Sequence, residues 1–173
     1  MLTGPNGAGK SSLLRQIAGL LEIEQGEIAL AGGDPELGIS EKAHYAGHLD
    51  GLKPSMSAIE TLRFWAAYLG GGDDAFVERA LEAMALAPLA DLPVAYLSAG
   101  QKRRLSLARL AVCPRPLWLL DEPSVALDAA SVGRLRGFMA AHLAQGGIIV
   151  AATHLDLGLA NARELRLGRE AAA

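Results

Sequence analysis

Residues near the amino terminus match the pattern G-x-x-x-x-G-K-S/T, which binds the phosphates of nucleotides. These residues are Gly4, Pro5, Asn6, Gly7, Ala8, Gly9, Lys10 and Ser11, and Ser12 follows them. Glycines let backbone N–H groups converge on phosphate oxygens, because no Cβ stands in the way. Lys10 supplies a positive charge for the β and γ phosphates, and the Ser11 hydroxyl is placed to ligate Mg²⁺. The pattern therefore predicts a nucleotide with Mg²⁺ as the ligand.

A pair of carboxylates follows an apolar run later in the chain. Residues 117–120 are Leu-Trp-Leu-Leu, and Asp121 and Glu122 come directly after them. Such a run is typical of a strand that is buried on both faces of a parallel sheet. Asp121 would then lie at the strand end, where it can hold Mg²⁺, and Glu122 is placed to polarise a water molecule for attack on the γ-phosphate. Without the phosphate-binding loop, a solvated acidic loop would be an equal alternative.

Two further patterns are weak when each is taken by itself. A predicted helix starts within the segment Leu97, Ser98, Ala99, Gly100 and Gln101. Ser98 is a natural N-cap, and Gly100 lets a backbone N–H group approach an anion closely, but many helices begin in this way. His154 follows the apolar run 148–153. A single histidine there would usually have a structural role.

The elements that must position these residues alternate along the chain. Apolar periodicity and capping residues predict helices at 11–21, 57–69, 75–87, 99–112 and 128–145. Apolar runs predict strands at 1–3, 26–31, 43–46, 117–120 and 148–153. In the helix at 99–112, the polar residues Lys102, Arg103, Ser106 and Arg109 are predicted to face outward. The alternation predicts an α/β fold with a mostly parallel core sheet and its site at the strand ends.

Composition limits the remaining possibilities. The chain has 173 residues, a net charge of −3 and no basic run, so we predict one domain and no nucleic-acid partner. The single cysteine, Cys113, lies in an apolar stretch and is predicted to be a small buried side chain. No run of 18 apolar residues is present, so the chain is expected to reach a membrane only through a partner. Hydrophobic residues make up 51%, which fits either a partner-binding surface or alanine richness.

In their order along the chain, these patterns resemble the ATP-binding-cassette (ABC) family. That family carries a P-loop, an L-S-G-G-Q signature, an Asp-Glu strand and a switch histidine in this sequence. Residues 97–101 resemble the signature with Ala99 in place of the more usual glycine, residues 124–128 resemble the D-loop that ends in Asp128, and His154 resembles the switch histidine. The resemblance covers almost the whole chain and implies one ABC-type P-loop NTPase domain at 1–173, with a helical subdomain at about 50–112 that carries the signature.

The resemblance also implies a mechanism and an assembly. It identifies Lys10, Glu122 and His154 as catalytic residues of an ATP hydrolase, with Ser11 and Asp121 as ligands of Mg²⁺. In this family the signature of one chain completes the nucleotide site of another. The resemblance therefore implies a head-to-tail homodimer that holds two ATP molecules, and a monomer that is nearly inactive.

Within the family, two segments resemble the ATPase subunit of the bacterial haem exporter that serves cytochrome c maturation. These segments are residues 45–54 and 57–64, and residues 93–94 and 101–110 fit the same branch. The resemblance implies integral-membrane exporter subunits as partners and a place on the cytoplasmic face of the inner membrane. Two alternatives stay open: a soluble ABC ATPase of translation or DNA repair, and an inactive fragment. The transported substrate and the identity of the partners do not follow from these residues.

The chain departs from the family pattern in two places. By register, Leu49 occupies the position of the Q-loop glutamine, with His48 beside it. Leucine cannot ligate a metal, so either His48 substitutes or coupling at this loop is weaker. The N-terminal strands and their adenine-stacking aromatic residue are missing ahead of Met1. We therefore expect that the natural protein starts upstream, and that the chain as written is unstable or inactive.

Overall fold

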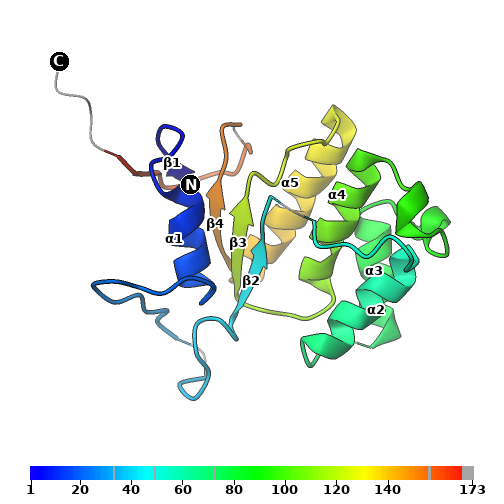
Figure 1. The fold of residues 1–173 in the computed structure, drawn as a ribbon, viewed down its shortest axis with the longest axis horizontal. Helices are drawn as coiled ribbons and strands as arrows, with labels where there is room; N and C mark the ends of the chain where they lie inside the picture. The colour runs from blue at the N-terminus through cyan, green and yellow to red at the C-terminus, as the bar shows by residue number, and fades with distance from the viewer. Residues whose placement is uncertain (33, 49, 72, 156, 169–173) are drawn as a thin grey trace.

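Five short parallel strands form one sheet in the order β2-β3-β4-β1-β5 (Figure 1). The structure is a computed structural model that describes residues 1–32, 34–48, 50–71, 73–155 and 157–168. The strands are β1 (Leu2–Thr3), β2 (Ala43–Ala46), β3 (Leu117–Asp121), β4 (Ile148–Ala152) and β5 (Leu165–Arg166). The predicted α/β fold with a mostly parallel sheet is confirmed.

The register of the sheet aligns the carboxyl ends of its strands. Asp121, the last residue of β3, pairs with Ala152 of β4, and Ala152 pairs with Leu2 of β1. Ala46, the last residue of β2, pairs with Leu120 of β3. The segments that follow these four strands therefore leave the sheet at one edge, which is where parallel α/β sheets bind ligands.

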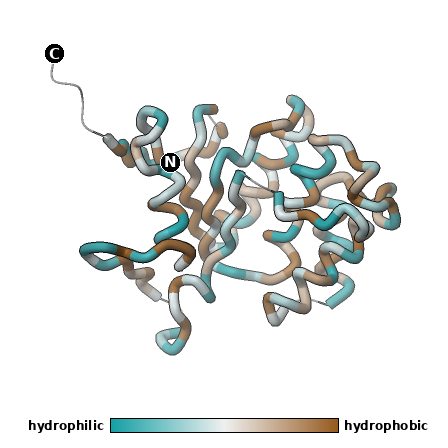
Figure 2. The backbone as a smooth tube through the Cα atoms, in the orientation of Figure 1, coloured by the Kyte–Doolittle hydropathy of each residue, from teal (hydrophilic) through white to brown (hydrophobic). Residues whose placement is uncertain are grey.

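The core has one hydrophobic layer on each face of the sheet. Along β3, Leu117 and Leu119 belong to the layer beneath α1 (Lys10–Ile17), whereas Trp118 and Leu120 belong to the layer beneath α5 (Ala129–Ala144). Successive strand residues point to opposite faces, so an unbroken apolar run is buried on both. Apolar colour accordingly follows the central strands in Figure 2.

A group of helices lies beyond α5 on the same side of the sheet (Figure 1). It contains α2 (Ala58–Tyr68), α3 (Asp74–Ala83), α4 (Ala99–Ala108) and the 3₁₀ turns η1 (Ala87–Leu89), η2 (Val94–Tyr96) and η3 (Arg109–Ala111). Ser57 and Glu60 form the predicted capping box at the start of α2, and the side chain of Asp73 caps α3. The predicted α3 helix ends four residues early, because Ala85 takes a left-handed conformation.

Three other sequence expectations are wrong. The first helix ends at Ile17 instead of residue 21, because Gly19 is left-handed and the amides of Gly19 and Leu20 bond back to Gln16 and Arg15. Residues 26–31 form no strand, and no strand among the described residues pairs with them. In α4, Arg103 and Ser106 are buried instead of facing outward.

Cys113 is buried, as the sequence predicted. Within the described part of the chain, none of the helices combines the length and the apolar character that crossing a bilayer needs.

Candidate active site

The phosphate-binding loop leaves the sheet at the end of β1 and leads into α1. Gly7 and Gly9 have φ values of 80° and 93°, the left-handed region that favours glycine. Gly4 has a φ of 135°, and a Cβ on it would lie 2.2 Å from the carbonyl oxygen of Leu167. Gly9 is the N-cap of α1 and has no side chain to satisfy the first amides of the helix. Those amides remain available to an anion, as the P-loop pattern requires.

Lys10 lies against the loop to which it belongs. Its Nζ donates to the carbonyl oxygens of Gly4 and Pro5, at 2.8 and 3.1 Å. The ammonium group is therefore held beside the start of the loop, within the segment whose amides would face a phosphate chain. That this charge serves the β and γ phosphates stays a prediction.

Asp121 and Ser11 lie on facing elements. Asp121 ends β3 and is buried, and α1 packs against β3 and β4. The hydroxyl of Tyr45, and to a smaller extent the Asp121 carboxylate, raise the pKa of Arg15 on α1. Arg15 follows Ser11 by four residues, so both side chains occupy the same side of the helix, the one that Asp121 faces.

These two side chains fit the ligand chemistry of Mg²⁺. A serine hydroxyl and a carboxylate are hard oxygen donors, and Mg²⁺ in nucleotide sites usually takes one or two such groups plus phosphate oxygens and water. The described residues contain no cluster of three or more histidine, cysteine, aspartate and glutamate side chains that could hold a metal by themselves. Both observations fit a site that binds Mg²⁺ through a few protein oxygens together with the phosphates of a bound nucleotide.

Glu122 and His154 meet at the strand edge. The Oε1 atom of Glu122 lies 3.5 Å from Nε2 of His154, although the two residues are 32 positions apart in the chain. The pair forms because the Glu122 amide donates to the carbonyl of Ala152, the last residue of β4, at 2.8 Å. Glu122 has a φ of 47°, a conformation that residues other than glycine rarely adopt and that is often found at functional sites. The structure thus brings together two residues that the sequence placed in one site.

The signature segment starts α4. Ser98 is the N-cap, and its Oγ accepts from the amide of Gln101 at 3.2 Å, while Oε1 of Gln101 accepts from the amide of Ser98 at 2.7 Å. Leu97 is buried, whereas Ser98 and Ala99 are exposed. A Cβ on Gly100 would lie 3.1 Å from the carbonyl oxygen of Ala126, so glycine allows the D-loop to approach closely. α4 and α1 lie on opposite sides of the sheet, so the signature does not meet the phosphate-binding loop of its own chain (Figure 1).

The D-loop ends in a helix cap. Asp128 precedes α5, and its Oδ1 accepts from the amide of Ser131 at 2.8 Å. Hydrogen bonds from Ser131 lower the pKa of Asp128. Ala126, within the same loop, has a φ of 65°. The loop is therefore fixed at its end and turns sharply before it.

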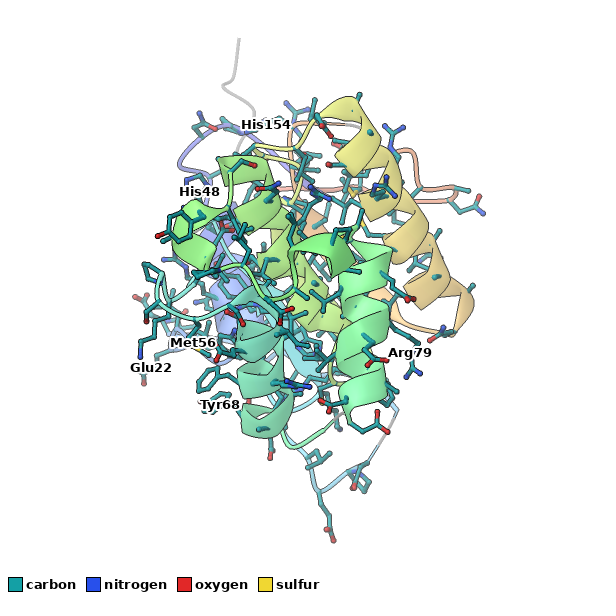
Figure 3. All side chains as sticks on the ribbon, turned by 90° about the vertical axis from the view of Figure 1, so that its right-hand side faces the viewer. Glu22, His48, Met56, Tyr68, Arg79 and His154 are labelled. Atoms are coloured by element: carbon teal, nitrogen blue, oxygen red, sulfur yellow. The ribbon has the colours of Figure 1, made fainter. Side chains whose placement is uncertain are left out.

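The loop after β2 reaches the same edge of the sheet. His48 is exposed and lies toward the end of the molecule that also holds His154 (Figure 3). Leu49, which occupies the expected Q-loop position, falls outside the described residues. The neighbouring Gly47 and Asp50 both bind Arg103 of α4. Whether His48 takes the role of the glutamine stays a prediction.

Sequence reasoning missed Arg103 and Arg109. Arg103 is 3% exposed and makes contacts with two loops of the site. Arg109 donates to the carbonyl oxygen of Tyr45, and its guanidinium lies 4.9 Å from the ring centre of Trp65. The helical pattern predicted that both side chains face outward, because a sequence pattern treats every charged residue as solvent-exposed. The buried acceptors that compensate their charge come from distant segments.

Comparisons with known proteins extend these observations. Residues 1–125 match the family model described as ABC transporter. The chain is 58% identical over 167 residues to the cytochrome c biogenesis ATP-binding export protein CcmA of Nitrobacter winogradskyi, covering 96% of this chain and 82% of that protein. It is 55% identical over 170 residues to the protein of the same name from Rhodopseudomonas palustris, covering 98% and 84%.

Solved structures agree with the fold. A putative ABC transporter ATP-binding protein from Pyrococcus furiosus superposes with a TM-score of 0.79 at 25% identity, covering 96% of this chain and 82% of that one. An ATP-binding subunit of an ABC transporter superposes with a TM-score of 0.75 at 28% identity, covering 89% and 67%.

Proposed function

This chain belongs to the ABC transporter family, and on that basis we propose that it is the ATP-hydrolysing subunit of a bacterial inner-membrane haem exporter that serves cytochrome c maturation. One observation carries the catalytic part: the register of β1, β3 and β4 gathers the P-loop, the Asp121–Glu122 pair and His154 at one edge of the sheet. The names of the relatives at 52–59% identity support the transport part. Those export proteins match nearly the whole chain, so the soluble alternative is not favoured.

The P-loop binds the triphosphate in this mechanism. Free amides at the start of α1 and the Lys10 ammonium face the β and γ phosphates, where the helix dipole adds to the attraction. Ser11 and Asp121 would hold Mg²⁺. When bound, that ion would supply neutralisation of the negative charge on the triphosphate.

Glu122 acts as the general base. Its carboxylate is 24% exposed, so a water molecule can reach it, and it accepts the proton of that water as the oxygen attacks the γ-phosphate. His154, which is 60% exposed and beside Glu122, donates toward the developing charge on the phosphate oxygens. The remaining donors come from Ser98 and its neighbours in a second copy of the chain.

The proposed assembly is a head-to-tail homodimer bound to integral-membrane subunits at the cytoplasmic face of the inner membrane. The opposite placement of α1 and α4 supports the dimer, because one chain cannot close its own site. The aromatic side chains of Phe64 and Tyr68 on α2 stack on each other and are more than half exposed, which supports a docking face for a membrane partner.

Replacing Glu122 by glutamine tests the catalytic assignment. The amide keeps the shape but cannot take a proton, so we expect the turnover of ATP to fall by about 100-fold or more. ATP affinity, measured with a fluorescent nucleotide analogue, should remain within a few fold. Glu60→Gln is the matched control, because Glu60 belongs to the cap of α2 and a glutamine there can still cap the helix. Normal turnover in Glu122→Gln would remove Glu122 from the role of base.

A further inference from the structure

Arg103 occupies a position between three motifs of the site. It belongs to α4, two residues after the last residue of the signature, and it is 3% exposed. A buried guanidinium is costly unless acceptors surround it. The acceptors around the Arg103 guanidinium therefore indicate which parts of the site it holds in place.

All the donors of Arg103 find acceptors in the loop after β2 or at the end of β3 and in the loop that follows it. Nη1 donates to the carbonyl of Gly47 at 2.8 Å and to Oδ1 of Asp50 at 3.0 Å. Nη2 donates to the carbonyls of Asp121 and Glu122 at 3.1 and 2.8 Å, and Nε lies 3.4 Å from the carbonyl of Pro123. A guanidinium has five N–H groups in a fixed fork, so this arrangement uses its full capacity.

The contacts fix the backbone of Glu122 on both sides. Its carbonyl accepts from Arg103, and its amide donates to the carbonyl of Ala152 at 2.8 Å. These two bonds hold Glu122 at a φ of 47°, from which the carboxylate reaches His154. Without the fork, the loop could relax toward an ordinary conformation, and the carboxylate would turn away from its place beside His154.

We propose that Arg103 is a positioning residue for Glu122, and that it ties the loop after β2 to the loop after β3. The proposal rests on the proposed function, in which Glu122 is the general base. Its consequence is mechanical. If Gly47 and Asp50 move, the Arg103 guanidinium moves with them and shifts the carbonyl of Glu122. The conformation of the loop after β2 therefore sets the conformation of the loop after β3.

Two variants separate this role from a general loss of stability. Arg103→Lys keeps the charge but loses the fork, and Asp50→Asn weakens only the arm that reaches the loop after β2. Arg115→Lys is the matched control, because Arg115 also donates to two carbonyls, of Ser40 and Ala43 at 3.0 and 2.7 Å, at the opposite end of β2 and β3. Steady-state ATP hydrolysis, normalised to the folded fraction measured by circular dichroism, gives kcat and KM for each.

For Arg103→Lys we expect kcat to fall about tenfold, with KM for ATP and nucleotide affinity within about twofold, since only transition-state geometry changes. Asp50→Asn should lower kcat less, and the double variant should fall by less than the product of the two single effects. Arg115→Lys should keep the wild-type kcat even if its melting temperature drops.

Wild-type kcat in folded Arg103→Lys would overturn the proposal, and so would a rise in KM at constant kcat. If Arg103→Lys does not fold, the comparison of Asp50→Asn with the wild type decides, and an unchanged kcat there counts against the link between the loops. The Glu122→Gln variant distinguishes a failure of the proposed base from a failure of the proposed role of Arg103. Turnover that persists in Glu122→Gln overturns the proposed base and this inference together, whereas its loss with normal Arg103→Lys turnover overturns this inference alone.

Discussion

His44 shows how a single side chain can set the response of the fold to acid. It lies on β2, is 5% exposed, and its Nε2 is 2.6 Å from the carbonyl oxygen of Cys113. Burial lowers the pKa of His44 to about 4, and the nearby charges of Arg115, Arg109 and His142 act in the same direction, while the bond to Cys113 opposes them. The neutral ring donates to that carbonyl, so protonation must take place on the buried Nδ1.

The low pKa of His44 predicts that stability falls with acid. Above pH 6.5 the His44 ring is neutral in both the folded and the unfolded chain, so its titration takes nothing from the free energy of unfolding. As the pH falls from 6.5 toward 4, the unfolded chain binds a proton that the folded chain refuses, so the free energy of unfolding decreases by up to about 1.4 kcal/mol per pH unit. Urea unfolding at several pH values measures this slope.

The matched variants for that experiment are His44→Gln and His48→Gln. Glutamine at position 44 can still donate to Cys113, so its slope between pH 6.5 and 4 should flatten, although overall stability drops. A smaller slope should remain, because burial lowers the pKa of His142 as well. His48 is exposed, so His48→Gln controls for the loss of a histidine without the loss of a buried ring. Equal slopes in His44→Gln and the wild type would contradict the assignment.

At the scale of an element, α4 begins with a serine that has two separable roles. The Ser98 hydroxyl caps the helix, and the proposed dimer also uses it against the γ-phosphate bound by the other chain. Ser98→Ala removes both roles and should cost about 0.5–2 kcal/mol of stability. Ser98→Asp keeps the cap but sets a carboxylate against the phosphate. We expect a near-normal melting temperature and at least a tenfold loss of turnover for Ser98→Asp.

Thermal melts and steady-state hydrolysis on the same preparations check both expectations. Ser57→Asp on α2 serves as the control, since Ser57 is also the N-cap of a capping box but lies outside the site. Normal turnover in Ser98→Asp would mean that the serine only caps its helix.

Local patterns predicted those elements whose causes are local. The apolar runs at β3 and β4, the capping box of α2 and the P-loop could all be found from neighbouring residues. β5 could not, because Leu165 and Arg166 are exposed and the strand is held by backbone bonds from Leu165 and Leu167 to Met1 and Thr3. β5 forms because it pairs with β1, which is distant from it in the sequence.

The same distinction holds within the site. Asp121, Glu122 and His154 were predicted because each follows an apolar run, and parallel strands end at one edge. Arg103 was missed because its acceptors lie 18–20 and 53–56 residues away in the chain. The strand expected at 26–31 was wrong because an apolar pattern states a preference, while a strand also needs a partner that its amides can reach.

At the scale of the whole molecule, the site is divided between two places. The P-loop and Glu122 belong to one edge of the sheet, and Ser98 lies on α4, across the sheet from α1 (Figure 1). A head-to-tail pair would bring the signature of each chain to the P-loop of the other and form two equivalent sites. A variant with a defect in the P-loop half of the site should then regain activity when it is mixed with a variant whose defect lies in the signature half.

Mixing Lys10→Ala with Ser98→Asp tests this division. Each variant alone should lose most of its turnover, because both of its sites carry a defect. In a mixed dimer, one site receives both defects and the other receives none, so an equal mixture should regain up to about a quarter of the wild-type rate. A mixture of Lys10→Ala with Glu122→Gln should stay inactive, since both defects lie on the same half and every site keeps one. If the signature instead served its own chain, neither mixture would recover, because no chain would carry an intact site.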